Sequence, residues 1–285
     1  MSGTDFHQKL SPPEYASRFQ FLKLSFPYPH VLHVELNRFW REYGVAFSMI
    51  AQDADVRVVV LSSAVKKAFS AGVDLSFLQS LPNTSDPGRR ALAIRSTIFE
   101  FQNAIGAPQR CPQPVIAAVH GLAIGLGVDI LSACDIRWAA ADAVFSIKEV
   151  DVGLAADIGT LARLPKLTGN ASLLLELALT ARNFGPEEAT QVGMVSKVVP
   201  GSHDEVVGAA LEFAKGITAK SPIAVAGTKH LIAHARDHTI QENLDYTAIW
   251  NASMTQAPDM GDAARAALKR EKVAFAPLGK TNAKL

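Results

Sequence analysis

The sequence predicts an α/β fold followed by a helical region, and two observations carry this prediction. Short apolar runs typical of buried strands alternate with stretches of helical spacing in residues 1–201, whereas residues 202–285 contain helical patterns only. The 285 residues, of which 48% are hydrophobic, can also bury a large core. We therefore expect an α/β core over residues 1–201 and a helical C-terminal region over residues 202–285.

Four segments are predicted to be strands. Arg18–Phe26 and Val31–Leu36 partly alternate apolar and polar residues on either side of Pro27-Tyr28-Pro29-His30, which indicates a β-hairpin. Val56–Leu61 and Val115–Val119 are continuous apolar runs of the kind found in buried strands.

Helical spacing separates and follows these strands. In the predicted core the helices are Arg90–Ile105, Ile124–Ser132 and Ala171–Ala181. In the C-terminal region they are Asp204–Thr218, Pro222–Ala235, Ile240–Gln256 and Pro258–Glu271. Several of these helices carry broad apolar faces, which favours packing on the core or on another subunit.

Composition excludes several classes of partner. With 28 basic and 27 acidic residues and no long basic run, the chain is not expected to bind nucleic acid or an anionic membrane. Cys111 and Cys134 lie far apart in sequence, so neither a disulfide framework nor a cysteine-ligated zinc site is expected. The first 20 residues lack an apolar segment after a basic start, so we expect no secretory signal and no membrane insertion.

The last three residues suggest a location. Ala283-Lys284-Leu285 resembles the Ser-Lys-Leu peroxisomal signal, with a small residue, a base and a leucine. The alternative is a solvated tail that ends this way by chance. We expect a peroxisomal protein, with the mitochondrion as the alternative.

Two glycine-bearing turns are candidates for binding an oxygen atom. Phe69–Leu75 and His120–Asp129 each follow a predicted strand, and glycines there allow free N–H groups to point at a ligand. Alternatively, each turn is only a tight connection. The glycines at 121, 125 and 127 do not match G-x-G-x-x-G, and no Gly-Lys-Ser/Thr follows, so a dinucleotide or phosphate loop is disfavoured.

Three carboxylates occur in largely apolar surroundings: Asp129, Glu149 and Asp157. A buried carboxylate is costly unless it is paired or used, and carboxylates crowded in a dry pocket can serve as acid and base near neutral pH. The alternative is a structural role, either capping a helix or pairing with Arg163 or Lys148. Asp135 and Asp151 are assigned to structure.

The histidines are expected to be structural. His120 closes an apolar strand without a neighbouring serine or cysteine, which favours a packed histidine. His230, His234 and His238 recur at helical spacing, but no glutamate follows His230 as H-E-x-x-H requires. A solvated helix face is therefore favoured there, and no metal site is expected.

The stretch from Pro114-Val115-Ile116-Ala117-Ala118-Val119-His120-Gly121 through Cys134-Asp135-Ile136-Arg137 resembles the crotonase (enoyl-CoA hydratase/isomerase) superfamily. The resemblance extends from about Phe21 to Phe275. It implies a crotonase-like spiral of β-β-α units with a helical C-terminal oligomerisation region, built into a homotrimer or homohexamer.

The resemblance also implies an acyl-CoA substrate and an oxyanion hole for its thioester carbonyl. By position, the N–H donors would be those of Val73 and Leu126. The residues expected around the thioester are Ala71, Gly72, Val73, Asp74, Leu75 and Leu126.

The three acids indicate one branch of this family. Enoyl-CoA hydratases carry glutamate where Asp129 stands and glycine where Asp157 stands, whereas Δ3,5-Δ2,4-dienoyl-CoA isomerases carry aspartate, glutamate and aspartate. The resemblance therefore implies conversion of 3,5-dienoyl-CoA to 2,4-dienoyl-CoA in fatty acid β-oxidation, with Glu149 and Asp157 moving a proton between C2 and C6 and Asp129 tuning the pocket. No metal or cofactor is implied, since coenzyme A is part of the substrate. The alternatives are an enoyl-CoA hydratase and a non-catalytic acyl-CoA-binding protein.

Two departures from the family pattern affect these expectations. After Leu36-Asn37-Arg38, Phe39-Trp40 follows at once, so a loop that helps hold the CoA nucleotide in the family is missing. Leu126 stands where glycine is usual. The first change favours weaker CoA binding, and the second a narrower pocket with its backbone donor retained.

Overall fold

The computed structural model describes residues 18–36, 40–74 and 82–279. Within these residues the main sheet has the strand order β1-β2-β3-β5-β7-β9, and a smaller sheet has the order β4-β6-β8. The main strands are β1 (Leu22–Tyr28), β2 (Val31–Leu36), β3 (Val58–Ser63), β5 (Val115–Val119), β7 (Ile136–Ala140) and β9 (Lys197–Val199). The predicted α/β fold is confirmed.

The predicted N-terminal hairpin is present, but its first strand was placed too early. β1 begins at Leu22 rather than Arg18 and pairs antiparallel with β2. The backbone amides of Gln20 and Phe21 donate instead to the Glu42 carboxylate, at 3.1 and 2.8 Å. A side chain of the following helix therefore takes the donors that a longer strand would offer.

The other strands of the main sheet are parallel. β2 pairs with β3, β3 with β5, β5 with β7 and β7 with β9, all in parallel register. Every residue of β3 and β5 is buried, as expected for strands covered on both faces. The predicted strand Val115–Val119 is confirmed at both ends, and the predicted Val56–Leu61 is shifted by two residues.

The smaller sheet was not predicted. It consists of β4 (Ala68–Ser70), β6 (Leu122–Ile124) and β8 (Val144–Ser146), and both of its pairings are parallel. Each strand has only three residues, too few for apolar alternation to be recognised. β4 overlaps the first glycine-bearing segment and β6 lies within the second, so this sheet brings the two segments together.

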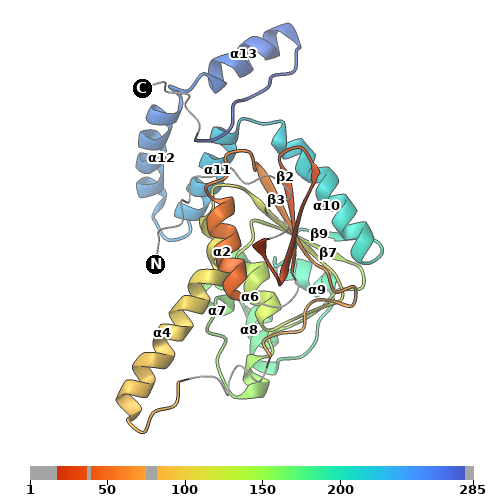
Figure 1. The fold of residues 1–285 in the computed structure, drawn as a ribbon, viewed down its shortest axis with the longest axis vertical. Coiled ribbons are helices and arrows are strands. Elements are labelled where there is room, and N and C mark those ends of the chain that lie inside the picture. Colours follow the sequence, from red (N-terminus) through yellow and green to blue (C-terminus); the bar gives the residue numbers. More distant parts are fainter. Residues whose placement is uncertain (1–17, 37–39, 75–81, 280–285) are drawn as a thin grey trace.

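Helices cover both faces of the main sheet (Figure 1). On one face α10 (His203–Thr218) buries Val206, Val207 and Ala210 against β3, β5 and β7. On the other, α2 (Trp40–Ile50) buries Tyr43 and Phe47 in the larger core cluster. Each apolar helix face thus covers one side of the strands.

Further helices extend the body. α4 (Pro87–Ile105) buries residues only near its C-terminal end, so the rest of this helix projects from the core (Figure 1). The remaining ones are α5 (Ala107–Arg110), α6 (Leu126–Ser132), the 3-10 helix η1 (Glu149–Val152), α7 (Thr160–Leu167), α8 (Ala171–Thr180) and α9 (Pro186–Gln191).

The described part of the C-terminal region is helical, as predicted. After α10 come α11 (Pro222–His234), α12 (Ile240–Met254) and α13 (Asp259–Lys269), which gather at the end of the molecule opposite the tip of α4 (Figure 1). Within the described ranges, none of the helices is both long and apolar enough to cross a lipid bilayer.

Gly121 holds the start of β6 against the chain leading into β4. Its φ is 52°, and a Cβ there would lie 2.3 Å from the backbone oxygen of Lys67. We expect Gly121→Ala to lower the free energy of unfolding by about 3 kcal/mol, because the clash is with backbone. Gly153→Ala is the control, since Gly153 also has a positive φ but nothing within 4 Å of its Cβ position.

Urea unfolding measures both changes. The control should lose only about 1 kcal/mol, the cost of a left-handed conformation for alanine. Equal losses in the two variants would show that the close approach of Gly121 to Lys67 contributes nothing.

Candidate active site

The carboxyl ends of the small sheet bring the candidate residues together. β4 leads into Ala71–Asp74, β6 into Gly125 and Leu126, and β8 leads through Ile147 and Lys148 to Glu149. Because the three strands are parallel neighbours, these segments emerge at the same edge. Ligand sites of parallel sheets commonly lie at such an edge.

The first turn, Ala71–Asp74, lies directly against the second. Gly72 has a φ of 102°, and a Cβ on this residue would lie 3.6 Å from the carbonyl oxygen of Ile124. The side chain of Val73 packs against the core, which fixes the direction of the backbone at this point. Leu75, the last residue expected around the thioester, lies outside the described residues.

The second turn begins α6. Gly125 has a φ of 52° and donates its N–H to the carbonyl oxygen of Ser146 in β8, at 2.9 Å. Leu126 is the first residue of the helix, so its N–H has no acceptor within the helix. Val73 and Leu126 thus both lie at this edge of the small sheet, where the oxyanion hole is expected.

Asp129 is buried one turn into α6, with 2% of its surface exposed. Its Oδ1 accepts two hydrogen bonds from Thr160, one from the backbone N–H and one from the hydroxyl, both at 2.7 Å. Burial raises the pKa of the Asp129 carboxyl, while the bonds from Thr160 oppose that rise.

Glu149 is half-buried and faces the second turn. A Cβ on Gly125 would lie 3.2 Å from its Oε1, so glycine leaves room for this carboxylate. Its Oε2 is buried and has no hydrogen-bond partner within the described part of the chain. Burial first, and then the charges of Asp129 and Asp157, raise the pKa of Glu149 to about 7.

The raised pKa of Glu149 has a cost in stability. A carboxyl whose pKa is higher in the folded than in the unfolded protein destabilises the folded state at a pH where it is ionised in both. This cost disappears when the pH falls below the pKa of the unfolded chain. After allowance for solvent screening, we expect Glu149→Gln to raise the free energy of unfolding by about 1 kcal/mol at pH 8. Thermal unfolding at pH 8 and pH 4 tests this, since the gain should vanish at pH 4.

Asp157 is more exposed than the other two acids. Burial raises the pKa of its carboxyl, and its charge contributes to the raised pKa of Asp129 and Glu149. Its carbonyl oxygen accepts a hydrogen bond from Gln102 Nε2 at 2.6 Å, which ties this loop to α4. A cavity of about 360 Å³ lies beside it, and its lining includes Gln102, Gln109, Asp157, Gly159 and Arg163. Space is therefore available next to this carboxylate.

The alternative structural roles apply to only one of the three acids. Lys148 pairs with Asp151 at 2.6 Å rather than with Glu149. Arg163 donates to Gln109 Oε1 at 3.0 Å and to the carbonyl oxygen of Ile158 at 3.4 Å. Asp129, in contrast, does bind the N-terminus of α7 through Thr160. Its carboxylate therefore has a structural partner as well as two acidic neighbours.

Asp135 and Asp151 are structural, as predicted. Asp135 pairs with the buried Lys229 at 2.7 Å and accepts a hydrogen bond from the backbone N–H of Val115 at 2.8 Å. This pair fixes α11 to the start of β5. Asp151 makes the salt bridge with Lys148 on η1.

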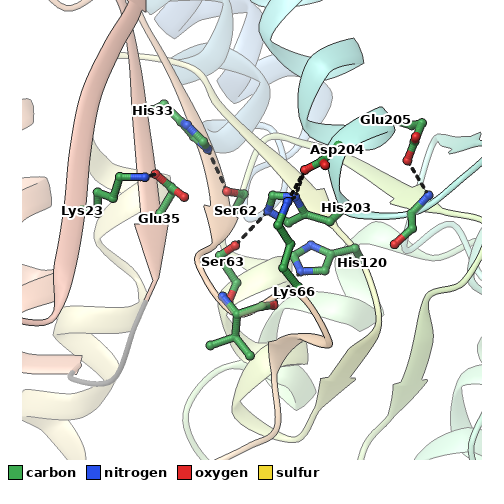
Figure 2. A network of polar contacts seen from close by, with 12 residues as sticks. Lys23, His33, Glu35, Ser62, Ser63, Lys66, His120, His203, Asp204 and Glu205 are labelled. Atoms are coloured by element: carbon green, nitrogen blue, oxygen red, sulfur yellow. Dashed lines mark hydrogen bonds and ion pairs between the residues drawn. The ribbon is translucent and has the colours of Figure 1, made fainter.

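His120 is a packed histidine, as predicted, and it belongs to a polar cluster beneath the N-terminus of α10 (Figure 2). Its Nε2 contacts the carbonyl oxygen of Val65 at 3.0 Å, and its ring meets that of His203 edge-on, with centroids 4.4 Å apart. His33 lies in the same view and contacts Ser62 Oγ at 2.7 Å. The cluster joins α10 to the ends of β3 and β5.

Burial lowers the pKa of both His33 and His120, and the nearby His203 lowers it further. The unfolded chain therefore binds more protons below the ordinary histidine pKa, so stability falls as pH drops from about 6.5. We expect a loss of up to about 1.4 kcal/mol per pH unit for each histidine. Urea unfolding between pH 7.5 and pH 5 measures this slope, and a double substitution, His33→Gln with His120→Gln, should flatten it.

His230 and His234 of α11, and His238 just after it, make ring contacts that were not predicted. His230 stacks on Trp250 with centroids 4.6 Å apart, and His234 stacks on Tyr246 at 4.3 Å. His230 and His238 are exposed, as expected for a solvated face, but the stacking on aromatic rings was not expected. Across the described ranges, no group of three His, Cys, Asp or Glu side chains is placed to hold a metal ion.

Thr160 and Gln102 were not identified from the sequence. Thr160 contacts a residue 31 positions away and Gln102 one 55 positions away, so neither contact has a local sequence signal. A threonine directly after Gly159, at the start of an amphipathic helix, was the available indication.

Comparisons with known proteins show the family of this chain. Residues 35–275 match the family model for enoyl-CoA hydratase/isomerase. A protein of Pongo abelii named mitochondrial Delta(3,5)-Delta(2,4)-dienoyl-CoA isomerase is 46% identical over 268 residues, covering 90% of this chain and 81% of the relative. An Arabidopsis thaliana protein named peroxisomal Delta(3,5)-Delta(2,4)-dienoyl-CoA isomerase is 43% identical, covering 87% of this chain and 93% of the relative.

A solved structure shows the same architecture. The enoyl-CoA hydratase of Bacillus anthracis superposes with a TM-score of 0.81 at 27% identity, covering 90% of this chain and 99% of that structure. The resemblance inferred from the sequence is thereby confirmed. This chain belongs to the enoyl-CoA hydratase/isomerase family.

Proposed function

We propose that this protein converts 3,5-dienoyl-CoA thioesters into 2,4-dienoyl-CoA thioesters in fatty acid β-oxidation. The observation that carries this proposal is the group of three neighbouring acids, in which the charges of Asp129 and Asp157 both raise the pKa of Glu149. The relatives named as dienoyl-CoA isomerases, at 46% and 43% identity, support the same reaction.

The proposed reaction is a proton transfer with no net change in composition. One carboxylate removes a proton from C2, and the electron pair moves through the conjugated system onto the thioester oxygen. The N–H groups of Val73 and Leu126 stabilise the negative oxygen. A neutral carboxyl then delivers a proton to C6, and the 2,4-diene forms.

Glu149 and Asp157 form the proton-transfer pair in this proposal, and Asp129 adjusts their neighbourhood. After one turnover the base is protonated and the acid is ionised, so the pair must exchange a proton with water before the next turnover. A pKa of about 7 suits Glu149 to this exchange, because both of its forms are populated near neutral pH. The pair titrates as a unit, so both orders of attack are compatible with it.

The reaction needs neither electron transfer nor a Lewis acid, so the proposal includes no redox cofactor and no metal. Coenzyme A enters as part of the substrate. The thioester itself acidifies the C2 proton, and the protein contributes the donors and the two acids.

The test is direct. Purified protein is incubated with 3,5-octadienoyl-CoA, and the ultraviolet spectrum is followed for growth of the conjugated 2,4-dienoyl thioester. Growth supports the proposal. No growth, together with hydration of a 2-enoyl-CoA, would show a hydratase instead, and neither reaction would indicate a protein that binds acyl-CoA without turnover.

We also propose that the protein assembles into a homotrimer or homohexamer. Large apolar side chains are exposed on the C-terminal helices of the single chain: Ile232, Ile240, Leu244, Ile249, Met260 and Leu268. Such a concentration is typical of an interface. Light scattering gives the mass, and a particle of 30.5 kDa, the mass of one chain, would contradict the proposal.

A peroxisomal location completes the proposal. The tripeptide Ala283–Leu285, which lies outside the described residues, resembles the signal read by the peroxisomal import receptor. The Arabidopsis relative is named peroxisomal and the Pongo relative mitochondrial. Imaging of an N-terminally tagged chain with and without these three residues distinguishes the two, and unchanged import after the deletion would rule out this signal.

A further inference from the structure

Thr160 is a fully buried residue that binds one of the candidate acids, Asp129. It is the first residue of α7, none of its surface is exposed, and it donates two hydrogen bonds to the same Asp129 oxygen. The residue before the helix, Gly159, has no side chain with which to cap it. Asp129 therefore caps α7 from a neighbouring helix.

This contact fixes both the position and the charge of Asp129. Two donors converge on Oδ1 at 2.7 Å, the length of a strong charge-assisted hydrogen bond. The N-terminus of α7 adds the favourable field of its backbone dipoles. Both effects, together with the positive charge of Arg163, stabilise the ionised form of a carboxyl that burial alone would drive towards the neutral form.

Asp129 and Glu149 both lie beside Gly125, since the backbone N–H of Asp129 donates to the Gly125 carbonyl oxygen at 3.3 Å and a Cβ on Gly125 would lie 3.2 Å from Glu149 Oε1. After burial, the charge of Asp129 is the next cause of the raised pKa of Glu149. If Asp129 lost its charge, Glu149 would titrate at lower pH. The acid strength of Glu149 therefore depends on two bonds made by a residue that does not touch it.

We propose that Thr160 is a positioning residue that holds the Asp129 carboxylate in place as a negative neighbour of Glu149 in the candidate site. This inference rests on the proposed function for its importance to turnover. The contact itself is present whether or not the chain is an isomerase, and its effect on Glu149 can be measured without turnover.

The surrounding loop allows Thr160 to be changed on its own. Asp157, three residues earlier, is held by Gln102, and Arg163 lies so close over Gly159 that a Cβ there would be 1.6 Å from its Nη1. Arg163 is itself bonded to Gln109 on α5. The loop is therefore anchored independently of the Thr160 hydroxyl.

The experiment replaces Thr160 by valine, which keeps the shape and the backbone N–H and removes the hydroxyl donor. We expect the limb of the pH–rate profile that reports Glu149 to move to lower pH by about one unit. The direction is the same whether Glu149 acts as base or as acid. Thr160→Ser, which keeps the hydroxyl, should restore the profile, and Thr218→Val in α10 is the control for a half-buried threonine outside the site.

A second readout does not depend on turnover. Glutamate labelled with 13C at the side-chain carboxyl is incorporated, the Glu149 resonance is assigned from its loss in Glu149→Gln, and its titration is followed by NMR. A downward shift of the Glu149 pKa in Thr160→Val, reversed in Thr160→Ser, supports the inference even if no isomerase activity is found.

If the valine variant does not fold, Thr160→Ala carries the same prediction, because it also removes the hydroxyl without adding volume. A Glu149 titration that is unchanged or moved to higher pH in a folded variant would overturn the inference. Absence of isomerase activity in the wild-type protein would count against the proposed function but not against this inference.

Discussion

Replacing Glu149 by glutamine is expected to lower kcat with 3,5-octadienoyl-CoA by about a thousandfold, and replacing Asp157 by asparagine should have a similar effect. Acid–base catalysis by a positioned side chain typically contributes 10²- to 10⁴-fold, and both amides keep the shape while losing the ability to exchange a proton. Initial rates from the growth of the conjugated diene measure the loss.

Isotope exchange separates the roles of the two acids. With the reaction run in deuterium oxide, the variant that lacks the C2 base should fail to exchange the C2 proton. The variant that lacks the C6 acid should still exchange C2 without forming product. Mass spectrometry and proton NMR of the recovered thioester distinguish these patterns.

Asp151→Asn is the matched control. Asp151 lies two residues from Glu149 but pairs with Lys148 on the surface, so its loss should change the rate by less than about twofold. Full activity in both Glu149→Gln and Asp157→Asn would remove these two acids from the mechanism and leave Asp129 as the remaining candidate.

The strands and helices that could be predicted were those with a clear pattern of apolar residues along the sequence. Val115–Val119 was placed correctly at both ends because five successive apolar residues are required in a strand buried on both faces. α10 was placed within one residue of its start at His203, where Glu205 and Ser202 form a capping box. β4, β6 and β8 were missed because three residues do not establish a period.

The candidate site was only partly predictable, for a related reason. The glycines at 72 and 125 indicated backbone that other residues rarely adopt, and both have a positive φ in the structure. The sequence also singled out Asp129, but it offered capping and chemistry as alternatives. The structure shows that one carboxylate can cap α7 and influence Glu149 together, a combination that depends on contacts across 31 residues.

Leu126→Pro tests whether the backbone N–H of Leu126 is an oxyanion donor, and a large loss of activity is expected. Proline is tolerated at the first position of a helix, where its missing N–H would have no helical acceptor, and Gly125 can supply the unusual backbone angles before it. The substitution therefore removes one proposed oxyanion donor without a large loss of stability. We expect kcat/KM to fall by about 10²- to 10³-fold.

Leu126→Ala is the necessary comparison, because it removes the same side chain and keeps the N–H. The leucine side chain of the wild type packs against the core, so the alanine variant should lose some stability. Because this variant keeps the N–H, its kcat/KM should change by less than about tenfold. Melting temperatures confirm that both variants are folded. If proline and alanine gave equal rates, the Leu126 amide would not be a donor, and the leucine at this position would affect only the shape of the pocket. If Leu126→Pro were inactive and Leu126→Ala active, the backbone N–H at this position would be what the oxyanion hole needs. The glycine that is usual here in the family would then be dispensable for the oxyanion hole.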